Sequence, residues 1–129
     1  MNSRDRHAPI HDYRDLTFWK DSMALAVEIY RLTNAFPPDE RFGMSSQMRR
    51  CATSIPANIA EGFGRESRQS FIQYLRISQG SLKELETLAE LARRVGLLGG
   101  DESEGVASKC TSLGKMLRSL IRKLEQKGQ

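Results

Sequence analysis

The sequence predicts an all-α fold, an antiparallel up-down-up-down four-helix bundle. Four long segments carry apolar residues at alternating spacings of three and four residues, which is the period of an amphipathic helix. The connections between these segments are short, so successive helices are expected to be antiparallel neighbours. The chain of 129 residues has 39% hydrophobic residues, 28% charged residues and only 4 prolines, which favours one helical domain with its own core.

The bundle is expected at residues 16–127, after a flexible arm at residues 1–15 that shows no apolar period. The first helix is expected at about residues 17–34. Its apolar residues form two neighbouring rows that together make a wide buried face: Trp19, Met23, Ala26 and Tyr30 in one row, and Leu25, Ile29, Leu32 and Phe36 in the other. Pro37 then ends the helix, because proline disfavours helical geometry in the residue before it.

The second helix is expected at about residues 41–62, with its start somewhere between Glu40 and Ser45. Its apolar stripe consists of Met44, Met48, Cys51, Ala52, Ile55, Ile59 and Phe63. Pro56 lies inside this stripe and removes one helical hydrogen bond. We expect a kink there rather than a break, because the stripe continues beyond the proline. Gly62 and Gly64 are expected to end the helix in the left-handed conformation.

The third and fourth helices are expected at about residues 67–95 and 101–126. The third has a heptad seam at Phe71, Leu75, Ser78, Leu82, Leu85, Ala89 and Ala92. Gly80, in its middle, favours a close approach of two helices. The fourth has a similar stripe at Val106, Cys110, Leu113, Leu117, Leu120 and Leu124. Asp101 and Glu104 have the spacing of a capping pair at its start.

Positive charge is concentrated in two segments. The whole chain has a formal net charge of +4, whereas residues 41–76 and residues 115–129 each carry +4 on their own. Every basic residue of the first segment is an arginine, whose planar guanidinium suits phosphate oxygens, so this segment favours a surface for a polyanion or a protein partner. The second segment is explained equally well as a binding surface or as a solvated basic helix end whose charge complements the helix dipole.

Residues that support catalysis or metal binding are sparse, and we expect neither an enzyme nor a cofactor. His7 and His11 lie in the arm with Pro9 between them, and no carboxylate–histidine pattern follows. Cys51 and Cys110 lie on apolar stripes without a C-x-x-C motif, which predicts buried, reduced thiols. No apolar run is long enough to span a membrane and no secretory signal is visible, so a cytoplasmic protein is expected.

The most specific motif is SQMRRCATSIPANIAEGFGR at residues 46–65. With Leu16-x-x-Trp19-Lys20 and with the GSLxELET pattern at residues 80–87, it resembles a family of four-helix-bundle proteins over about residues 13–125. That family includes proteins encoded in intervening sequences of bacterial large-subunit ribosomal RNA genes and the accessory variability proteins of diversity-generating retroelements. The resemblance implies a barrel-like homo-oligomer with a basic surface, pentameric in characterised relatives. In retroelement relatives this barrel binds a reverse transcriptase and nucleic acid.

Five residues of the motif are expected to have structural roles: Ser54, Pro56, Asn58, Glu61 and Gly62. Ser54 is placed to bond a carbonyl freed by Pro56, one turn back along the helix. Asn58 and Glu61 lie three residues apart on one face, where they either lock a neighbouring helix or subunit or bind a partner.

The candidate residues for binding nucleic acid or a partner are Arg49, Arg50, Arg65, Arg68 and Arg76. Arg49 is the better candidate for a phosphate, whereas Arg50 is expected to pair with Glu61 across a helix or subunit boundary. If Arg65, Arg68 and Arg76 group with Arg49, they form one basic patch at the corner between the second and third helices.

The leading hypothesis is a non-catalytic oligomeric protein that binds RNA, or RNA and DNA, through this arginine-rich surface, with a reverse transcriptase as a further candidate partner. Binding is expected to be electrostatic and shape-driven, because no base-reading motif is visible. The alternative is a protein scaffold that uses the same surface for an acidic protein partner and binds no nucleic acid.

Overall fold

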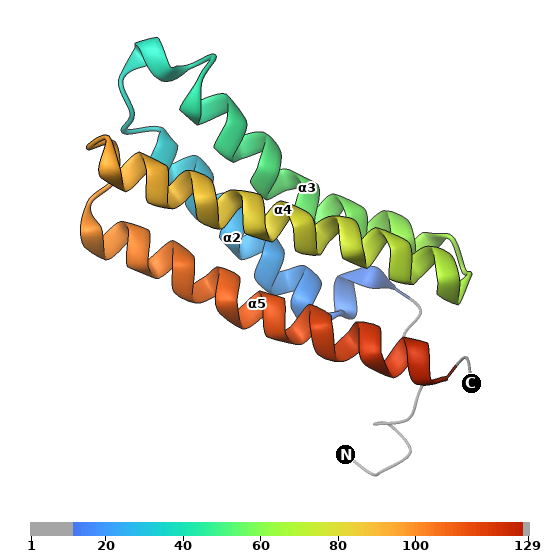
Figure 1. Cartoon of the computed structure of the whole chain (residues 1–129). Helices are drawn as coiled ribbons and strands as arrows, with labels where there is room; N and C mark the ends of the chain where they lie inside the picture. Colours follow the sequence, from blue (N-terminus) through green and yellow to red (C-terminus); the bar gives the residue numbers. More distant parts are fainter. Residues whose placement is uncertain (1–11, 128–129) are drawn as a thin grey trace.

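The computed structural model describes residues 12–127, and within this range it contains four long helices and no strand (Figure 1). The long helices are α2 (Thr17–Thr33), α3 (Met44–Gly64), α4 (Arg68–Arg94) and α5 (Gly100–Gln126). Two short 3-10 turns, η1 (Tyr13–Asp15) and η2 (Pro38–Glu40), precede α2 and α3. The apolar spacing therefore identified each of the four helices.

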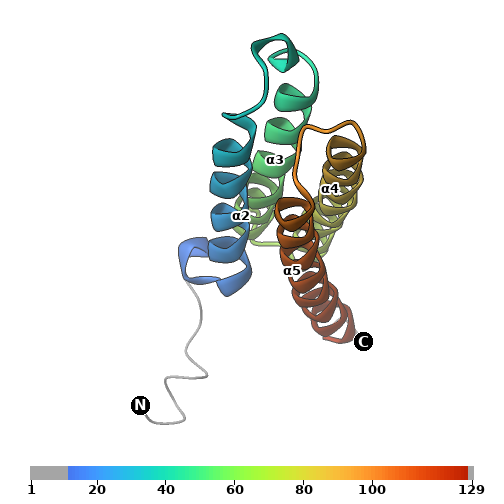
Figure 2. The same cartoon turned by 90° about the vertical axis from the view of Figure 1, so that its left-hand side faces the viewer.

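Successive helices run antiparallel and pack side by side, in the order α2, α3, α4, α5 around the bundle (Figures 1 and 2). The most extensive contact joins α3 to α4, and a smaller contact between α5 and α2 closes the bundle. The centre is filled by buried side chains from all four helices: Leu25, Ile29, Met48, Ile55, Ile59, Leu75, Leu82, Leu85, Val106, Cys110 and Leu117. The described chain is thus the predicted four-helix bundle.

Helix α2 buries one of its two predicted apolar rows fully and the other only in part. Leu25, Ile29 and Leu32 lie in the core, and so does Ala26 of the other row, whereas Met23 and Tyr30 are 40% and 44% exposed. The predicted wide buried face is therefore confirmed only in part. The physical reason is that α2 contacts only α3 and α5 among the long helices, so within residues 12–127 its outer side is covered only near its start, by η1.

Helix α3 continues through Pro56 and changes direction near its middle, as Figure 1 shows. It begins at Met44, inside the expected range of residues 40–45. Residues 41–43 form a turn, and the Met44 N–H donates to the Glu40 carboxylate at 3.2 Å. This side-chain acceptor satisfies a backbone donor that would otherwise have no partner at the helix start.

The C-terminal end of α3 lies two residues beyond its predicted position. The helix continues through Gly62 and Gly64, so neither glycine ends it in the left-handed conformation as predicted. Glu66 has the positive backbone angle instead, with φ of 61°, and the chain turns there into α4. A non-glycine residue in this region carries backbone strain, and the sequence pattern did not identify it.

The close approach of two helices occurs at Gly62 on α3 and not at Gly80 on α4, where it was predicted. A Cβ atom on Gly62 would lie 2.6 Å from Tyr74 Cβ and 3.2 Å from Phe71 Cδ1. A Cβ atom on Gly80 would meet no atom within 4 Å. The absence of a side chain at Gly62 therefore allows the backbones of α3 and α4 to approach next to their connecting turn.

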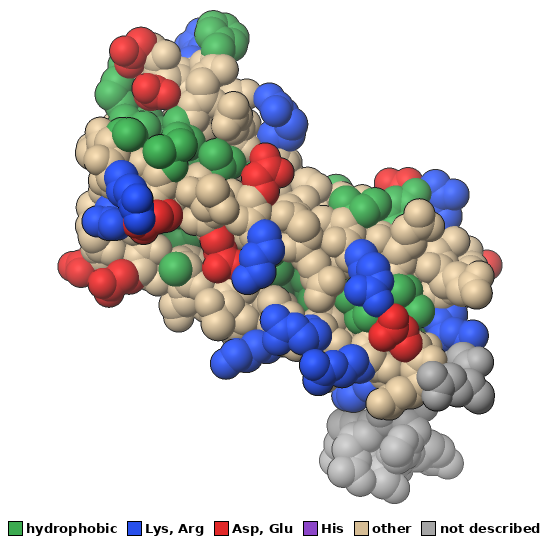
Figure 3. Space-filling view, in the orientation of Figure 1, with side chains coloured by type: hydrophobic (Ala, Val, Ile, Leu, Met, Phe, Trp, Pro, Cys, Tyr) green, Lys and Arg blue, Asp and Glu red, His purple; other side chains and the backbone are tan. Residues whose placement is uncertain are grey.

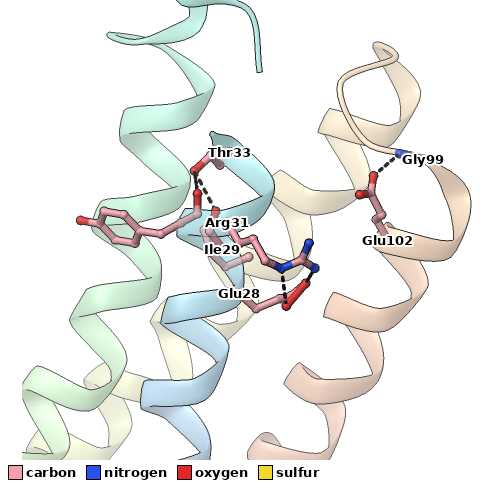
Figure 4. Close-up of polar contacts among 7 residues, drawn as sticks. Glu28, Ile29, Arg31, Thr33, Gly99 and Glu102 are labelled. Atoms are coloured by element: carbon pink, nitrogen blue, oxygen red, sulfur yellow. Dashed lines mark hydrogen bonds and ion pairs between the residues drawn. The ribbon is translucent and has the colours of Figure 1, made fainter. Parts of the chain in front are cut away.

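Helix α5 begins with a cap that differs from the predicted one. The Gly99 N–H donates to Glu102 Oε1 at 3.1 Å (Figure 4). The Gly99 carbonyl accepts the first helical bond, from Ser103. Asp101 lies inside the helix, so the predicted capping pair of Asp101 and Glu104 was wrong. The cause is that the helix starts at Gly100, which shifts the capping spacing by two residues.

The last residues of the predicted arm pack on the bundle. Tyr13, in η1, contacts Trp19 edge-on with 5.2 Å between the ring centroids. Residues 1–11, which include His7 and His11, lie outside the described residues. Over residues 12–127, no helix combines the length and the apolar character needed to cross a membrane.

Candidate functional site

The five arginines predicted to bind a partner lie in three separate places. Arg49 and Arg50 are in the first half of α3, Arg65 and Arg68 flank the turn between α3 and α4, and Arg76 lies two turns into α4. Sixteen residues separate Arg49 from Arg65 along α3, which corresponds to about 24 Å at the helical rise. The single basic patch that was considered from the sequence is therefore not formed within one chain.

Arg49 is fixed against the end of α2. Its Nε donates to Thr33 Oγ1 at 2.8 Å, and its Nη2 donates to Asn34 Oδ1 at 2.9 Å. Its guanidinium lies over the Tyr30 ring, 4.6 Å from the centroid. Thr33 itself is buried and donates to the Ile29 carbonyl at 2.7 Å (Figure 4), so it is a rigid partner for the arginine.

Arg50 is exposed, and its Nη2 donates to Ser46 Oγ at 3.2 Å, one turn earlier on the same helix. The predicted pairing of Arg50 with Glu61 does not occur within the described chain, because the two residues lie eleven positions apart on one helix. Glu61 binds other partners, and Arg50 is left without a carboxylate within 4.0 Å among the described residues.

Glu61 joins α3 to α4. Its Oε2 accepts from the Tyr74 hydroxyl at 3.0 Å and from Arg65 Nη2 at 3.1 Å. The hydrogen bond from Arg65 and then that from Tyr74 lower the pKa of the Glu61 carboxyl below its usual value. Arg65 is thus engaged within the chain, whereas Arg68 is exposed and has no carboxylate within 4.0 Å among the described residues.

A polar seam runs between the middles of α3 and α4. Ser54 Oγ lies 2.9 Å from Ser81 Oγ and accepts from Asn58 Nδ2 at 3.0 Å. Asn58 also donates to the Ser54 carbonyl at 2.8 Å, and Ser78 donates to the Ile55 carbonyl at 2.9 Å. Ser54 therefore bonds the facing helix instead of a carbonyl freed by Pro56, because Ser81 lies directly opposite it. Together these bonds fix the register of α3 against α4.

A groove with basic walls lies between α4 and α5. This α4–α5 groove has a volume of about 430 Å³, and its charged lining consists of Arg76, Lys83 and Glu86 from α4 and of Lys115 and Arg118 from α5. Arg76 pairs with Glu125 at 2.6 Å and Lys83 with Glu86 at 3.2 Å, whereas the described chain places no carboxylate within 4.0 Å of the two α5 cations. Figure 3 shows basic side chains gathered over these two helices.

Of the four groove cations, only Arg76 was a candidate site residue from the sequence; Lys83, Lys115 and Arg118 were missed. Lys115 and Arg118 belong to the basic C-terminal segment, and their spacing of three places them on one helical face. Arg76 and Lys83 are seven residues apart, which likewise gives one face of α4. The signal was present in the spacing, but the pairing of these two faces depends on the packing of α4 against α5.

An apolar groove lies on the other side of the molecule, between α2 and α3. This α2–α3 groove has a volume of about 490 Å³ and is lined by Tyr13, Trp19, Met23, Ala26, Val27, Tyr30, Thr53, Pro56, Ala57 and Ala60. Val27 is 65% exposed, and Pro56 forms part of the floor. One wall of this groove is the partly exposed α2 row of Trp19, Met23, Ala26 and Tyr30.

The two cysteines are free and buried, as predicted. Burial raises the pKa of Cys51 to about 12, and the carboxylate of Glu84 contributes in the same direction. Burial likewise raises the pKa of Cys110 to about 12. Among the described residues no three His, Cys, Asp or Glu side chains form a group that could hold a metal ion, and His7 and His11 lie outside this range.

We expect both thiols to react with a thiol reagent only after unfolding. Below pH 9, the usual thiol pKa, the folded protein keeps Cys51 and Cys110 protonated and shielded. Because both pKa values are raised to about 12 by folding, the neutral thiols favour the folded state fully below pH 9, and this contribution is lost as the pH rises toward 12. Ellman titration with and without denaturant measures this, and two fast thiols in the native protein would contradict it.

Comparisons with known proteins identify a family. The model of the 23S rRNA-intervening sequence protein family matches residues 14–119. A solved structure of a protein of unknown function from the S23 ribosomal protein family of Bacteroides thetaiotaomicron has 31% identity and a TM-score of 0.75, covering 81% of this chain and 95% of that one. No curated protein matches the sequence. The chain therefore belongs to the 23S rRNA-intervening sequence protein family.

Proposed function

We propose that the protein is a non-catalytic, homo-oligomeric RNA-binding protein that contacts the phosphate backbone through the α4–α5 groove. The observation that carries this proposal is the pair of cations on α5, Lys115 and Arg118, which face a groove and have no carboxylate partner among the described residues. Cations of this kind release counterions when they contact phosphates, which drives binding without reading bases. Gly80 and Gly114 also line this groove, and the space beside both is open, since a Cβ atom on either would meet nothing within 4 Å.

The assembly part of the proposal rests on the α2–α3 groove. An apolar groove whose wall includes Met23, Val27 and Tyr30 as exposed side chains is a typical contact surface for a protein. We assign it to a second copy of this chain, in line with the homo-oligomer, pentameric in relatives, that the resemblance implies. Each added copy brings a further net charge of +4, so an assembly attracts a polyanion more strongly than one chain does.

The test is fluorescence-anisotropy titration of a structured RNA and a DNA duplex over a range of salt concentrations. We expect log affinity to fall linearly with log salt, and the Lys115→Gln/Arg118→Gln protein to have a slope shallower by about 0.7–0.9 for each lost phosphate contact. Lys20→Gln/Arg31→Gln removes the same charge from α2 and is the matched control, with a slope that stays near that of the unmodified protein.

Absence of RNA and DNA binding at low salt would contradict the proposal. It would favour the second candidate, a scaffold for an acidic protein partner, because carboxylates can replace phosphates against the same cations. A reverse transcriptase, the partner suggested by the resemblance to retroelement accessory proteins, is tested separately by co-purification from cells that express both proteins.

A further inference from the structure

A second basic cavity lies at the opposite end of α3 from the turn into α4. It is formed by the C-terminal end of α2, the connection that contains η2 and the first half of α3, and its volume is about 580 Å³. Arg41, Arg49 and Arg50 line it, together with the hydroxyl-bearing Ser46 and Thr53. No aspartate or glutamate lines this cavity, which we call the arginine pocket.

Arg49 is held in place in this pocket before any ligand binds. Its bonds to Thr33 and Asn34 use two of the five N–H donors of a guanidinium, so three donors remain. The Tyr30 ring under the guanidinium restricts its motion further. A fixed donor loses little conformational entropy on binding, which favours affinity for an anion of matching geometry.

The other two arginines form no ion pair within the described chain. Neither Arg41 nor Arg50 has a carboxylate oxygen within 4.0 Å among the described residues, and the Glu40 carboxylate accepts instead from the Met44 N–H. Ser46 Oγ accepts from Arg50, so its own hydroxyl proton is available to a ligand oxygen. Three guanidinium groups that line one cavity repel one another unless an anion lies between them.

We propose that the arginine pocket binds a phosphomonoester dianion, the group carried by a free nucleoside monophosphate or by the 5′ end of an RNA strand. A dianion with three terminal oxygens matches several guanidinium forks better than the single charge of a backbone diester does. The pocket is a cavity of the size that small ligands occupy, and Phe36, Pro37 and Pro38 give it an apolar rim for the remainder of a nucleotide.

This site does not depend on the α4–α5 groove. The pocket is lined by α2, α3 and their connection, and the groove by α4 and α5, so no residue belongs to both. The groove is proposed to contact internal phosphates along an RNA, whereas the pocket requires a terminal phosphate. A failure of the groove proposal therefore leaves the pocket measurable. The pocket does share Tyr30 and Thr53 with the α2–α3 groove, so a second copy seated in that groove would border the pocket.

The experiment compares ligands with and without a terminal phosphate on the full-length protein. Two results would support the proposal. Calorimetry detects binding of uridine 5′-monophosphate but not of uridine, or a short single-stranded RNA binds about tenfold more tightly with a 5′-phosphate than with a 5′-hydroxyl. A tenfold difference in affinity corresponds to about 1.4 kcal/mol. Binding of the mononucleotide alone identifies a free nucleotide as the ligand, and a gain confined to the RNA identifies a strand end.

Arg41→Gln/Arg50→Gln should abolish this preference for a terminal phosphate. Both side chains are exposed, so the substitutions are expected to leave the fold intact, with an unchanged circular dichroism spectrum. Arg93→Gln/Arg94→Gln removes the same charge at the end of α4 and should keep the preference, as should Lys115→Gln/Arg118→Gln. Equal binding with and without the terminal phosphate, or a preference that survives Arg41→Gln/Arg50→Gln, would overturn the proposal.

Discussion

Replacement of Gly62 by alanine is expected to lower the free energy of unfolding by about 1–3 kcal/mol, whereas the same replacement at Gly80 should raise it by about 0.5–1 kcal/mol. The new Cβ atom on Gly62 would lie 2.6 Å from Tyr74 Cβ, an atom fixed to the α4 backbone. Relief of this overlap requires the two helices to separate, and that would disturb the most extensive contact in the bundle.

Gly80 is the matched control because the chemical change is identical. It lies in the interior of α4, and its added methyl group would meet nothing within 4 Å. Only the gain in helix propensity is then left, which is favourable. Urea unfolding followed by circular dichroism, at one protein concentration for all variants, measures both effects. Equal stability of the Gly62→Ala protein and the unmodified protein would show that α3 and α4 do not approach this closely.

The pair of glycines also shows what the sequence could and could not predict. Periodicity identified each long helix, because apolar spacing records which side of a helix is buried. It could not tell which glycine meets a neighbouring helix, since Gly62 and Gly80 have the same chemistry and differ only in what packs against them. Gly62 was assigned to a helix end for its flexibility, and its role in packing became visible only with Tyr74 in place.

Helix ends were predicted less well than helix centres for a related reason. The left-handed residue after α3 is Glu66, although two glycines precede it, and α5 uses Glu102 with the Gly99 backbone instead of the Asp101 and Glu104 pair. Each end depends on one or two local hydrogen bonds, whose energies are about 1 kcal/mol. Several adjacent registers satisfy such bonds almost equally, so the packing of the whole helix decides among them.

The candidate site, like the helices, could be predicted from the sequence only in part. The arginine-rich character of residues 41–76 was visible in the sequence, but which arginines are engaged within the chain was not. Arg65 is paired with Glu61, and Arg76 with Glu125, which is 49 residues away. Such a partner can be found only when α4 and α5 are placed side by side. Charge counts therefore predict that a basic surface exists, and tertiary contacts determine where it is.

The α2–α3 groove leads to the prediction with the largest effect on assembly. Val27→Glu is expected to convert the proposed homo-oligomer into a folded single chain of 14.6 kDa. Val27 is 65% exposed in one chain, so a glutamate there stays hydrated and should change the free energy of unfolding by no more than about 0.5 kcal/mol. In an interface between copies, the same carboxylate would be buried without a partner, which costs several kcal/mol for each interface.

Light scattering coupled to gel filtration, at micromolar protein concentration, measures the mass of both proteins. Val95→Glu is the matched control, since Val95 is 59% exposed and follows α4, outside the groove. A mass of 14.6 kDa for the unmodified protein would refute the assembly, and an unchanged mass for Val27→Glu would place the interface elsewhere. If both substitutions dissociate the protein, two different surfaces meet in the interface. A contact between unlike surfaces builds a ring when its rotation closes and an open filament when it does not, and a closed ring is the geometry of the proposed barrel-like assembly.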